Sequence, residues 1–351
     1  MNKGNVVKAA LIGIGGWSTV IADAVKRSKK VELVTCFTRT PEKRRKFSEK
    51  YECDEEKSFE DLIKRDDVDA VLLTTPNAMH AEHAVLAARH GKHVFVDKPI
   101  ANTMVDGKKI VTACEEAGVV LLAGHDMRRL AGNRKAKVLI DGGAIGDPIQ
   151  VEANFSHALG FELTPDKFRW HGDDSGCPAG SLMTMGIHHV DTLNYFFGPI
   201  KSAFAYFNKL YIPADVEDVT ATIFEFESGV LGYLGSNYAS PKANWIYVYG
   251  TKANLLCLLS LPEVPFEEYL KIWPVVDRYT KLLLFEKGKD GAQEIPLTKG
   301  DPILEEIDEF ADCIQTGARP ETDGEGALVA LALIRAAIDS ARTGKQAKVE
   351  V

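Results

Sequence analysis

The sequence lacks the features that mark several large classes of protein. Its six cysteines form no CxxC pair and show no metal-ligand spacing, which predicts reduced thiols in a cytoplasmic protein without a metal site. No apolar run approaches the ~20 residues of a membrane span, so we expect no membrane partner. Because Lys8 interrupts the first apolar stretch, we also expect no secretory signal.

Acidic residues outnumber basic ones, 50 to 42. The 351-residue chain has a net charge of -8, and its longest basic cluster, residues 43–46, follows Pro41 as on a solvated helix face. We therefore expect no nucleic-acid partner. With 45% hydrophobic and 26% charged residues, the composition is that of an ordinary soluble protein, and the length predicts about two domains.

The first segment has the order strand, glycine turn, helix. An apolar run leads into Gly13, Gly15 and Gly16, and a helical pattern follows over residues 19–27. In this context glycines let the backbone approach a pyrophosphate, and the helix amino terminus offers it unpaired N–H groups. The third glycine position holds Ser18, which is still small. We predict a dinucleotide site that includes Gly13, Gly15, Gly16, Trp17 and Ser18.

No acid stands at the end of the second predicted strand, residues 31–37. An acid there would accept hydrogen bonds from both adenosine ribose hydroxyls and repel a 2′-phosphate. The chain has Thr38 and Arg39 instead, with Lys43 one helical turn further on. A hydroxyl and a guanidinium suit a phosphate, which predicts that NADP is preferred over NAD. The alternative is that Arg39 simply points into solvent.

Strands and helices continue to alternate up to about residue 125, which predicts a parallel, doubly wound Rossmann sheet. Ligands of such sheets lie at the carboxyl ends of the strands. His80 and His83 are spaced like a metal pair, but no thiol or acid completes a ligand set, so we favour surface or packing roles. Beyond the glycine turn, the residues expected near the cofactor are Thr75, Pro76, Asn77, His80, Asp97 and Lys98.

An apolar strand, residues 94–96, is followed by Asp97 and then by Lys98. A lysine at the end of a buried strand is badly placed for a merely structural role, because burying an ammonium group is costly unless it is paired. Pro99 fixes the turn after it, through a bond that can be cis at modest cost. The alternative is an ordinary surface lysine at a strand end.

The pattern changes after residue 125. A basic amphipathic helix is predicted over residues 128–143, and runs of alternating polarity with hairpin signals then predict a large, mainly antiparallel sheet with one open, aromatic-bearing face. We expect a Rossmann domain over 1–125 and an α+β domain over 126–351, whose last helices can pack back on the first domain. Residues 261–280 match no motif and are interpreted as an insertion or a strand edge.

A helix is predicted over residues 180–198, with one apolar and one polar stripe. This helix contains no Lys, Arg or Glu, so its polar side is expected to be covered. A covered polar stripe with a histidine is typical of an active-site wall, and a satisfied core histidine is the competing explanation. The polar stripe consists of Thr184, His188, Asp191 and Tyr195.

Four stretches together resemble the Gfo/Idh/MocA family of oxidoreductases: GIGGWS at 13–18, TTPNAMH at 74–80, GKHVFVDKPIA at 91–101 and the helix at 180–198. The resemblance implies a Rossmann domain, a nicotinamide cofactor and a sugar, polyol or related substrate. It also implies that Lys98 lies near the reacting carbon and that a cis bond precedes Pro99. In the family the open sheet serves oligomerisation, which implies a homodimer or homotetramer.

The same resemblance assigns roles on the helix at 180–198. His188 matches the catalytic histidine and Asp191 the acid one turn later, but Thr184 stands where the family often has an aspartate. Asp97 likewise replaces a glutamate. Because threonine cannot ionise, Lys98 and His188 remain as the catalytic candidates. The residues expected to contact substrate are Lys98, Arg169, Trp170, Thr184, His188 and Asp191.

We therefore predict an NAD(P)-dependent dehydrogenase or reductase that acts on CH–OH groups of a carbohydrate-like substrate, with NADP favoured. Whether His188 or Lys98 is the base stays open. Two alternatives are a non-catalytic, cofactor-binding regulator or sensor on the same fold, and a redox-neutral enzyme whose cofactor returns unchanged.

Overall fold

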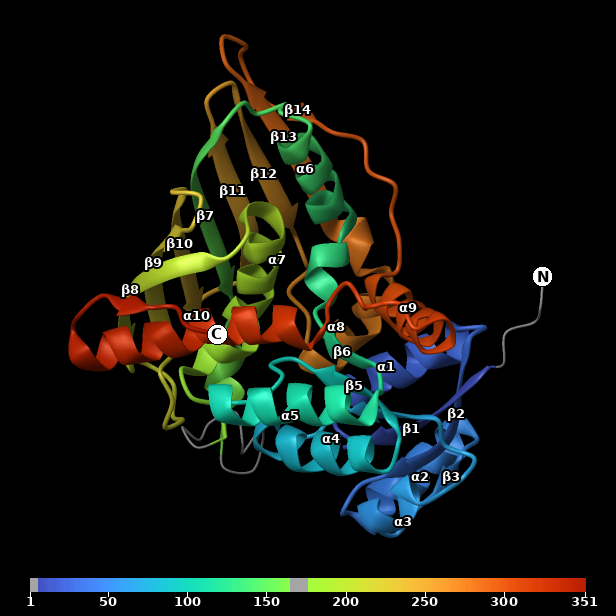
Figure 1. Ribbon diagram of the computed structural model, residues 1–351. Coiled ribbons are helices and arrows are strands. Elements are labelled where there is room, and N and C mark those ends of the chain that lie inside the picture. The colour runs from blue at the N-terminus through green and yellow to red at the C-terminus, as the bar shows by residue number, and fades with distance from the viewer. Residues whose placement is uncertain (1–5, 165–175) are drawn as a thin grey trace. The chain divides into compact units, whose positions relative to one another are not determined.

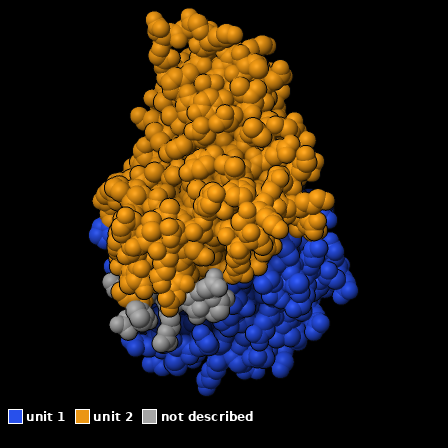
Figure 2. All heavy atoms as spheres, turned by 90° about the vertical axis from the view of Figure 1, so that its left-hand side faces the viewer, with its two compact units in different colours: residues 1–125, 265–274, 302–328 blue, residues 126–264, 275–301, 329–351 orange. Residues whose placement is uncertain are grey.

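The computed structural model describes residues 6–164 and 176–351, and the chain divides into two compact units. Unit 1 consists of residues 1–125, 265–274 and 302–328, and unit 2 of residues 126–264, 275–301 and 329–351 (Figure 2). No helix in the described ranges is long and apolar enough to cross a membrane.

Unit 1 contains a six-stranded parallel sheet in the order β3-β2-β1-β4-β5-β6 (Figure 1). Its strands are β1 Val7–Ile12, β2 Val31–Phe37, β3 Asp54–Glu55, β4 Ala70–Leu73, β5 His93–Asp97 and β6 Leu121–Gly124. The connecting helices are α1 Gly16–Arg27, α2 Pro41–Tyr51, α3 Phe59–Ile63, the 3₁₀ turn η1 Asn77–Met79, α4 His80–Arg89 and α5 Met104–Ala117. The predicted Rossmann fold is therefore confirmed.

Local sequence accounts for these elements. All four residues of β4 are buried, as expected for a central parallel strand covered on both faces. Thr103 caps α5 by accepting a hydrogen bond from the backbone N–H of Asp106, and Gly118 ends this helix in the left-handed region with φ 66°. Cap and glycine together fix the ends of α5, the helix that connects β5 to β6.

Two later segments of the chain complete unit 1. Helix α9, Pro302–Thr316, packs on α1, and Ser28 donates a hydrogen bond of 2.5 Å to Asp308. Helix α8, Phe266–Ile272, also contacts α1, and Trp273 just after it is buried. The middle part of 261–280 thus forms a helix of the first unit, so its interpretation as a strand edge is wrong, and its interpretation as an insertion stays a prediction.

Unit 2 is built on a nine-stranded sheet in the order β14-β13-β12-β11-β7-β10-β9-β8-β15. All neighbouring strands are antiparallel except β7 and β10, which are parallel. This mixed sheet confirms the predicted α+β class. The strands are β7 Pro148–Ser156, β8 Ile200–Asn208, β9 Val219–Phe226, β10 Leu231–Asn237, β11 Ala243–Gly250, β12 Ala253–Leu259, β13 Thr280–Glu286, β14 Gln293–Glu294 and β15 Ala347–Lys348.

The helix predicted over 128–143 is divided in two. A 3₁₀ turn, η2 Asp126–Arg129, comes first, Leu130 is extended, and α6 then spans Ala131–Asp141. The break has a tertiary cause: the Asp277 carboxylate accepts a hydrogen bond of 2.9 Å from the N–H of Ala131 and so caps α6 from a distant segment. The single continuous helix predicted here is therefore wrong.

The helix predicted over 180–198 begins with a π-helical turn, η4 Leu182–Gly186, and continues as α7, Ile187–Phe197. Helices α6 and α7 contact one face of the nine-stranded sheet, which Figure 1 shows. Three further elements complete the description: η3 Leu159–Glu162, and two that span the boundary between the units, η5 Trp273–Tyr279 and α10 Gly324–Thr343.

Candidate active site

Position 13, in the turn after β1, accepts only glycine. Its φ is 94°, and a Cβ built on it would lie 2.7 Å from the backbone nitrogen of Thr75. Any side chain would therefore be both strained and in collision with the backbone after β4. The Thr74 hydroxyl donates a hydrogen bond of 2.7 Å to the Gly13 carbonyl and holds the two loops together.

The amino terminus of α1 fits a pyrophosphate. Its Ncap is the exposed Gly15, no side chain caps it, and no atom lies within 4 Å of the position that a Gly15 Cβ would occupy. The first N–H groups of the helix are thus available to an anion. Ser18 is buried and donates to the Gly15 carbonyl at 2.7 Å, while Trp17 packs edge-on against Trp273 at 5.4 Å.

Three of the cations near the end of β2 differ in their surroundings. Arg44 is buried and binds both Glu55, at 3.2 Å, and the carbonyl of Thr38. Arg39 and Lys43 are exposed, and neither forms an ion pair with a carboxylate in the described part of the chain. Two cations with a nearby hydroxyl therefore remain able to bind a phosphate at this strand end.

The loop after β4 presents two polar atoms that the described residues leave without a partner, Thr75 Oγ1 and Asn77 Nδ2, both buried. Pro76 lies between them and precedes η1. A buried polar atom is normally hydrogen-bonded, so both fit a site that a ligand completes. They follow β4, which lies next to β1 in the parallel sheet, at the carboxyl ends where such sheets bind ligands.

His80 holds two loops together through its ring. It is fully buried, its Nε2 lies 2.8 Å from the Thr75 carbonyl, and its Nδ1 lies 3.0 Å from the Pro99 carbonyl. Burial lowers the pKa of His80 to about 4, which keeps the ring neutral near neutral pH. Both ring nitrogens are thus engaged by protein atoms.

Asp97 ends β5, and Lys98 follows it; both side chains are half-buried. The peptide bond between Lys98 and Pro99 is cis. Because β1, β4 and β5 are adjacent parallel strands, their carboxyl ends meet at one edge of the sheet. Gly13, Thr75 and Lys98 therefore share the edge at which α/β sheets bind ligands.

In unit 2, the buried His188 of α7 lies beside a carboxylate. Its Nδ1 is 3.3 Å from Asp126 Oδ1, and the side chains are 6% and 2% exposed, respectively. Asp126 begins η2, which packs on α7. The Phe155 ring covers His188 with centroids 6.0 Å apart. The residues therefore form a buried imidazole–carboxylate pair that the sequence did not predict.

Asp191, one turn after His188, forms a bidentate ion pair. Arg128 of η2 donates from Nε to Oδ2 at 2.8 Å and from Nη2 to Oδ1 at 2.5 Å. Both side chains are buried. The Arg128 guanidinium also lies 5.3 Å from the centre of the Tyr195 ring. Arg128 thus engages both carboxylate oxygens of Asp191. The contact of Asp191 with substrate stays a prediction.

Thr184 forms a hydrogen bond with the Tyr238 hydroxyl and donates another, of 3.1 Å, to the Gly180 carbonyl. Burial raises the pKa of Tyr238, so both groups of this pair are neutral near neutral pH. Thr184 thus carries a hydroxyl–hydroxyl contact and no charge. Arg169 and Trp170, also predicted to bind substrate, lie outside the described residues.

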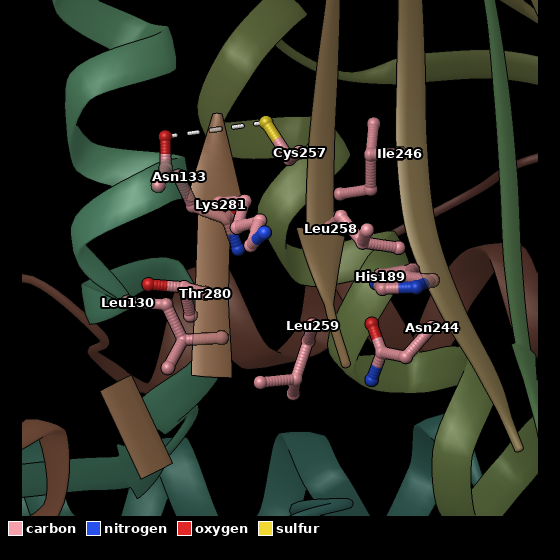
Figure 3. Close-up of a pocket in the computed structure, with 11 residues that line it drawn as sticks. Leu130, Asn133, His189, Asn244, Ile246, Cys257, Leu258, Leu259, Thr280 and Lys281 are labelled. Atoms are coloured by element: carbon pink, nitrogen blue, oxygen red, sulfur yellow. Dashed lines mark hydrogen bonds between the residues drawn. The ribbon is translucent and has the colours of Figure 1, made fainter. Parts of the chain in front are cut away.

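His189, the neighbour of His188, has a different environment. Its Nε2 lies 3.0 Å from the Asn154 carbonyl, and burial lowers its pKa to about 4. Figure 3 shows it in a small cavity, lined also by Asn133 and Asn244, with room for about one water molecule. A sugar cannot enter such a space. No described residues form a cluster of three or more side chains suited to a metal ion.

Sequence reasoning missed Asp126, Arg128 and Tyr238. Asp126 comes shortly after a predicted strand, a position that favours ligand contact, and this was the available signal. Its partner is 62 positions away, and nothing in the spacing indicates the pairing.

A parallel doubly wound sheet with a glycine turn after its first strand is typical of the class of dinucleotide-binding proteins. Residues 7–125 match the oxidoreductase family with an NAD-binding Rossmann fold, and residues 133–256 match the GFO/IDH/MocA C-terminal domain. The chain therefore belongs to the Gfo/Idh/MocA family, as predicted, and is an NAD(P)-dependent oxidoreductase of a family that acts on sugars and polyols.

Three relatives show the range of this family. An oxidoreductase from Desulfitobacterium hafniense, described as NADPH-dependent, is 36% identical, with a TM-score of 0.91 over 98% of each chain. The WlbA dehydrogenase of Bordetella pertussis, solved with NADH and UDP-GlcNAcA, is 26% identical with a TM-score of 0.82 over 99% of this chain and 100% of that one.

The third is the NADP-dependent D-xylose 1-dehydrogenase of Haloarcula marismortui, 27% identical over 99% of this chain and 94% of the relative. Relatives named as dehydrogenases do not favour the alternative of a non-catalytic regulator. They include both NADP- and NAD-type cofactors and different sugars, so the family alone fixes neither the cofactor nor the substrate.

Proposed function

We propose that this protein transfers a hydride between NADP and a hydroxyl or keto carbon of a sugar or polyol, with Lys98 and His188 as its catalytic residues. The observation that carries the proposal is the sheet edge of unit 1, where the glycine turn, the unpartnered Thr75 and Asn77 atoms and Lys98 meet. Unit 1 would bind the cofactor, and unit 2 would bind substrate and mediate oligomerisation.

When bound, the nicotinamide supplies the hydride acceptor or donor. In the oxidation direction the substrate hydroxyl must also lose its proton, and His188 Nε2 is our first candidate to take it. Lys98 Nζ would donate a hydrogen bond to the substrate oxygen and stabilise the negative charge that develops there. Lys98 as the base, with His188 as the hydrogen-bond donor, is the alternative.

The experiment that tests the activity is a panel of sugars, inositols and sugar acids with NADP⁺ and NAD⁺, followed at the nicotinamide absorbance, together with ketoses and NADPH for the reverse direction. Turnover of at least one polyol or sugar by the wild-type protein is the expected result. Tight NADP binding with no turnover across the panel in either direction would count against an oxidoreductase of this substrate class.

The preference for NADP rests on Arg39 and Lys43. Both are exposed cations without a carboxylate partner in the described part of the chain, and Thr38 adds a hydroxyl. A 2′-phosphate would gain a charge-assisted fork from Arg39, whereas the ribose hydroxyls of NAD would find no acid to accept their hydrogen bonds.

Arg39→Ala and Lys43→Ala should each weaken NADP⁺ binding about 10-fold and leave NAD⁺ binding nearly unchanged, because an exposed charge-assisted contact contributes about 1.4 kcal/mol. Arg45→Ala is the matched control, since it removes an exposed cation from the same helix. Fluorescence titration with both dinucleotides measures these effects. A wild-type protein that binds NAD⁺ more tightly than NADP⁺ would refute the preference.

Oligomerisation is proposed through the open face of the nine-stranded sheet. On neighbouring strands this face exposes Tyr206, Ile223 and Tyr233, at 72%, 55% and 36%, with Ile223 directly opposite Tyr233. Such a patch of large apolar side chains is expected to be covered, and a second copy of the chain is the occupant we propose.

Tyr206→Glu combined with Ile223→Glu should convert the oligomer to monomers, as measured by light scattering after size exclusion. Val105→Glu is the control, because Val105 is 64% exposed on α5 of unit 1. A wild-type protein that is monomeric at micromolar concentration would contradict the proposal.

A cytoplasmic location is also proposed. All six cysteines are free thiols, and five of them are buried. Burial raises the pKa of Cys114 and Cys257 to about 12, so these thiols stay protonated and unreactive. Free thiols are typical of proteins that work in a reducing compartment.

A further inference from the structure

Asp126 and His188 are brought together by tertiary packing alone. Asp126 begins a 3₁₀ turn, His188 lies in the first turn of α7, and Nδ1 is 3.3 Å from Oδ1. This separation is slightly longer than an ideal N–H···O hydrogen bond and within the range of an ion pair. Catalytic hydrogen bonds are often this loose before substrate binds.

Burial makes the contact energetically important. Taking a carboxylate out of water is unfavourable unless charges or N–H groups replace the lost hydration, and Asp126 is 1% exposed. Arg128, two residues later, directs its bidentate fork at Asp191. Two acid–base pairs thus join η2 and α7. In the first, Asp126 of η2 is the acid and His188 of α7 the base; in the second, Arg128 of η2 is the base and Asp191 of α7 the acid.

We propose that Asp126 is a positioning residue for His188, an inference that rests on the proposed role of His188 as the base. Asp126 Oδ1 accepts a hydrogen bond from His188 Nδ1–H and thereby fixes the tautomer in which Nε2 carries the lone pair. When Nε2 takes the proton of the substrate hydroxyl, the ring becomes an imidazolium and the Asp126 carboxylate, which stays ionised, stabilises it.

This arrangement supplies the carboxylate that residue 184 lacks. Thr184, four residues before His188, is neutral and is engaged with Tyr238 and Gly180. An acid at that position would lie on the same helix as His188, whereas Asp126 reaches the ring from η2. The carboxylate beside His188 therefore comes from a different element.

Other charges near α7 also affect the titration of His188, and the test has to account for them. Phe155 of β7 contributes an uncharged ring. On the described elements packed against α7, and on α7 itself, the charged and titratable groups are Asp126, Arg128, Arg129, Arg134, Lys135, Lys137, Asp141, Glu152, His189, Asp191 and Tyr195. Asp126→Asn changes one of these charges and keeps the shape of the side chain.

The test is a nitrogen NMR titration of the full-length protein labelled with ¹⁵N in histidine, in which His188→Gln identifies the His188 signals. Wild-type His188 should be the Nδ1–H tautomer when neutral. Asp126→Asn should move its protonation midpoint at least ~1 pH unit lower, because a nearby carboxylate favours the charged ring. Asp126→Glu should restore most of this shift, and Asp141→Asn, at an exposed acid of α6, should have no effect.

An Nε2–H tautomer in the wild-type protein would overturn the proposal without any variant, and so would an unchanged midpoint in a folded Asp126→Asn protein. The titration needs no turnover, so it separates this proposal from the activity itself. With a substrate from the panel, Asp126→Asn should lower kcat ~10–100-fold with little change in KM and move the acidic limb of the kcat/KM profile to lower pH. Retained turnover in His188→Gln would refute the base while leaving the tautomer result intact.

Discussion

Lys98 and His188 are presented by two different kinds of structure. Lys98 follows the last residue of the parallel strand β5, so the backbone of the sheet places this residue at the carboxyl end of the strands. His188 lies on a helix, and a buried carboxylate from another element lies beside its ring. The place of Lys98 in the sheet thus follows from one strand, whereas the contact of His188 with Asp126 depends on how two separate elements pack.

The largest expected effect is on turnover, and it tests both Lys98 and His188. Lys98→Ala and His188→Ala should each reduce turnover at least ~100-fold and leave NADP binding nearly intact, because each removes a proton-transfer or charge-stabilising group. Initial rates with the best substrate of the panel and a fluorescence titration with NADP⁺ measure the two properties.

Matched controls lie close by. Lys108→Ala removes an exposed lysine of α5, and His189→Gln changes the structural histidine next to His188; both should keep most of the turnover. If His189→Gln were as damaging as His188→Ala, the distinction between the two adjacent histidines would fail.

Substitutions at two glycines test how strongly the backbone of unit 1 constrains its turns. Gly13→Ala should lower the free energy of unfolding by about 3 kcal/mol, because a positive φ is combined with a clash against the Thr75 backbone. Gly91 has φ 70° but open space around a Cβ, so Gly91→Ala should cost about 1 kcal/mol. Urea unfolding measures both values, and equal losses would contradict a steric role for Gly13.

The pH dependence of stability compares the two units through one buried histidine in each. The pKa values of His80 in unit 1 and His189 in unit 2 are both lowered to about 4 by burial. Because these folded-state values lie below the unfolded value of ~6.5, their stabilisation is complete above that pH and is lost as the pH falls toward 4. The contribution of each histidine to the free energy of unfolding should fall by about 2 kcal/mol between about pH 7.5 and pH 5.

Denaturant unfolding at the two pH values checks this expectation, with His80→Gln and His189→Gln each flattening the pH dependence by about the same amount. A wild-type free energy of unfolding that is equal at both pH values would show that neither ring resists protonation.

The sequence predicted unit 1 well because its information is local. The apolar runs, the turn at Gly13 and the cap at Thr103 all depend on neighbouring residues, and the observed strands follow the predicted ones within a few residues. It predicted less where distant segments meet. Residues 265–274 join the first unit through Trp273 and Trp17, and Asp277 caps α6 within the helix predicted over residues 128–143.

The sequence by itself determined the family, the order of strands and helices in the first 125 residues and the strand end that carries Lys98, since periodicity and turn chemistry are properties of short stretches. Only the tertiary structure decided which of two adjacent histidines lies beside a carboxylate, and which carboxylate that is. Asp126 and His188 are far apart in the chain, and their contact depends on how η2 packs against α7. Such pairings follow from the summed packing of whole elements, which no local pattern encodes.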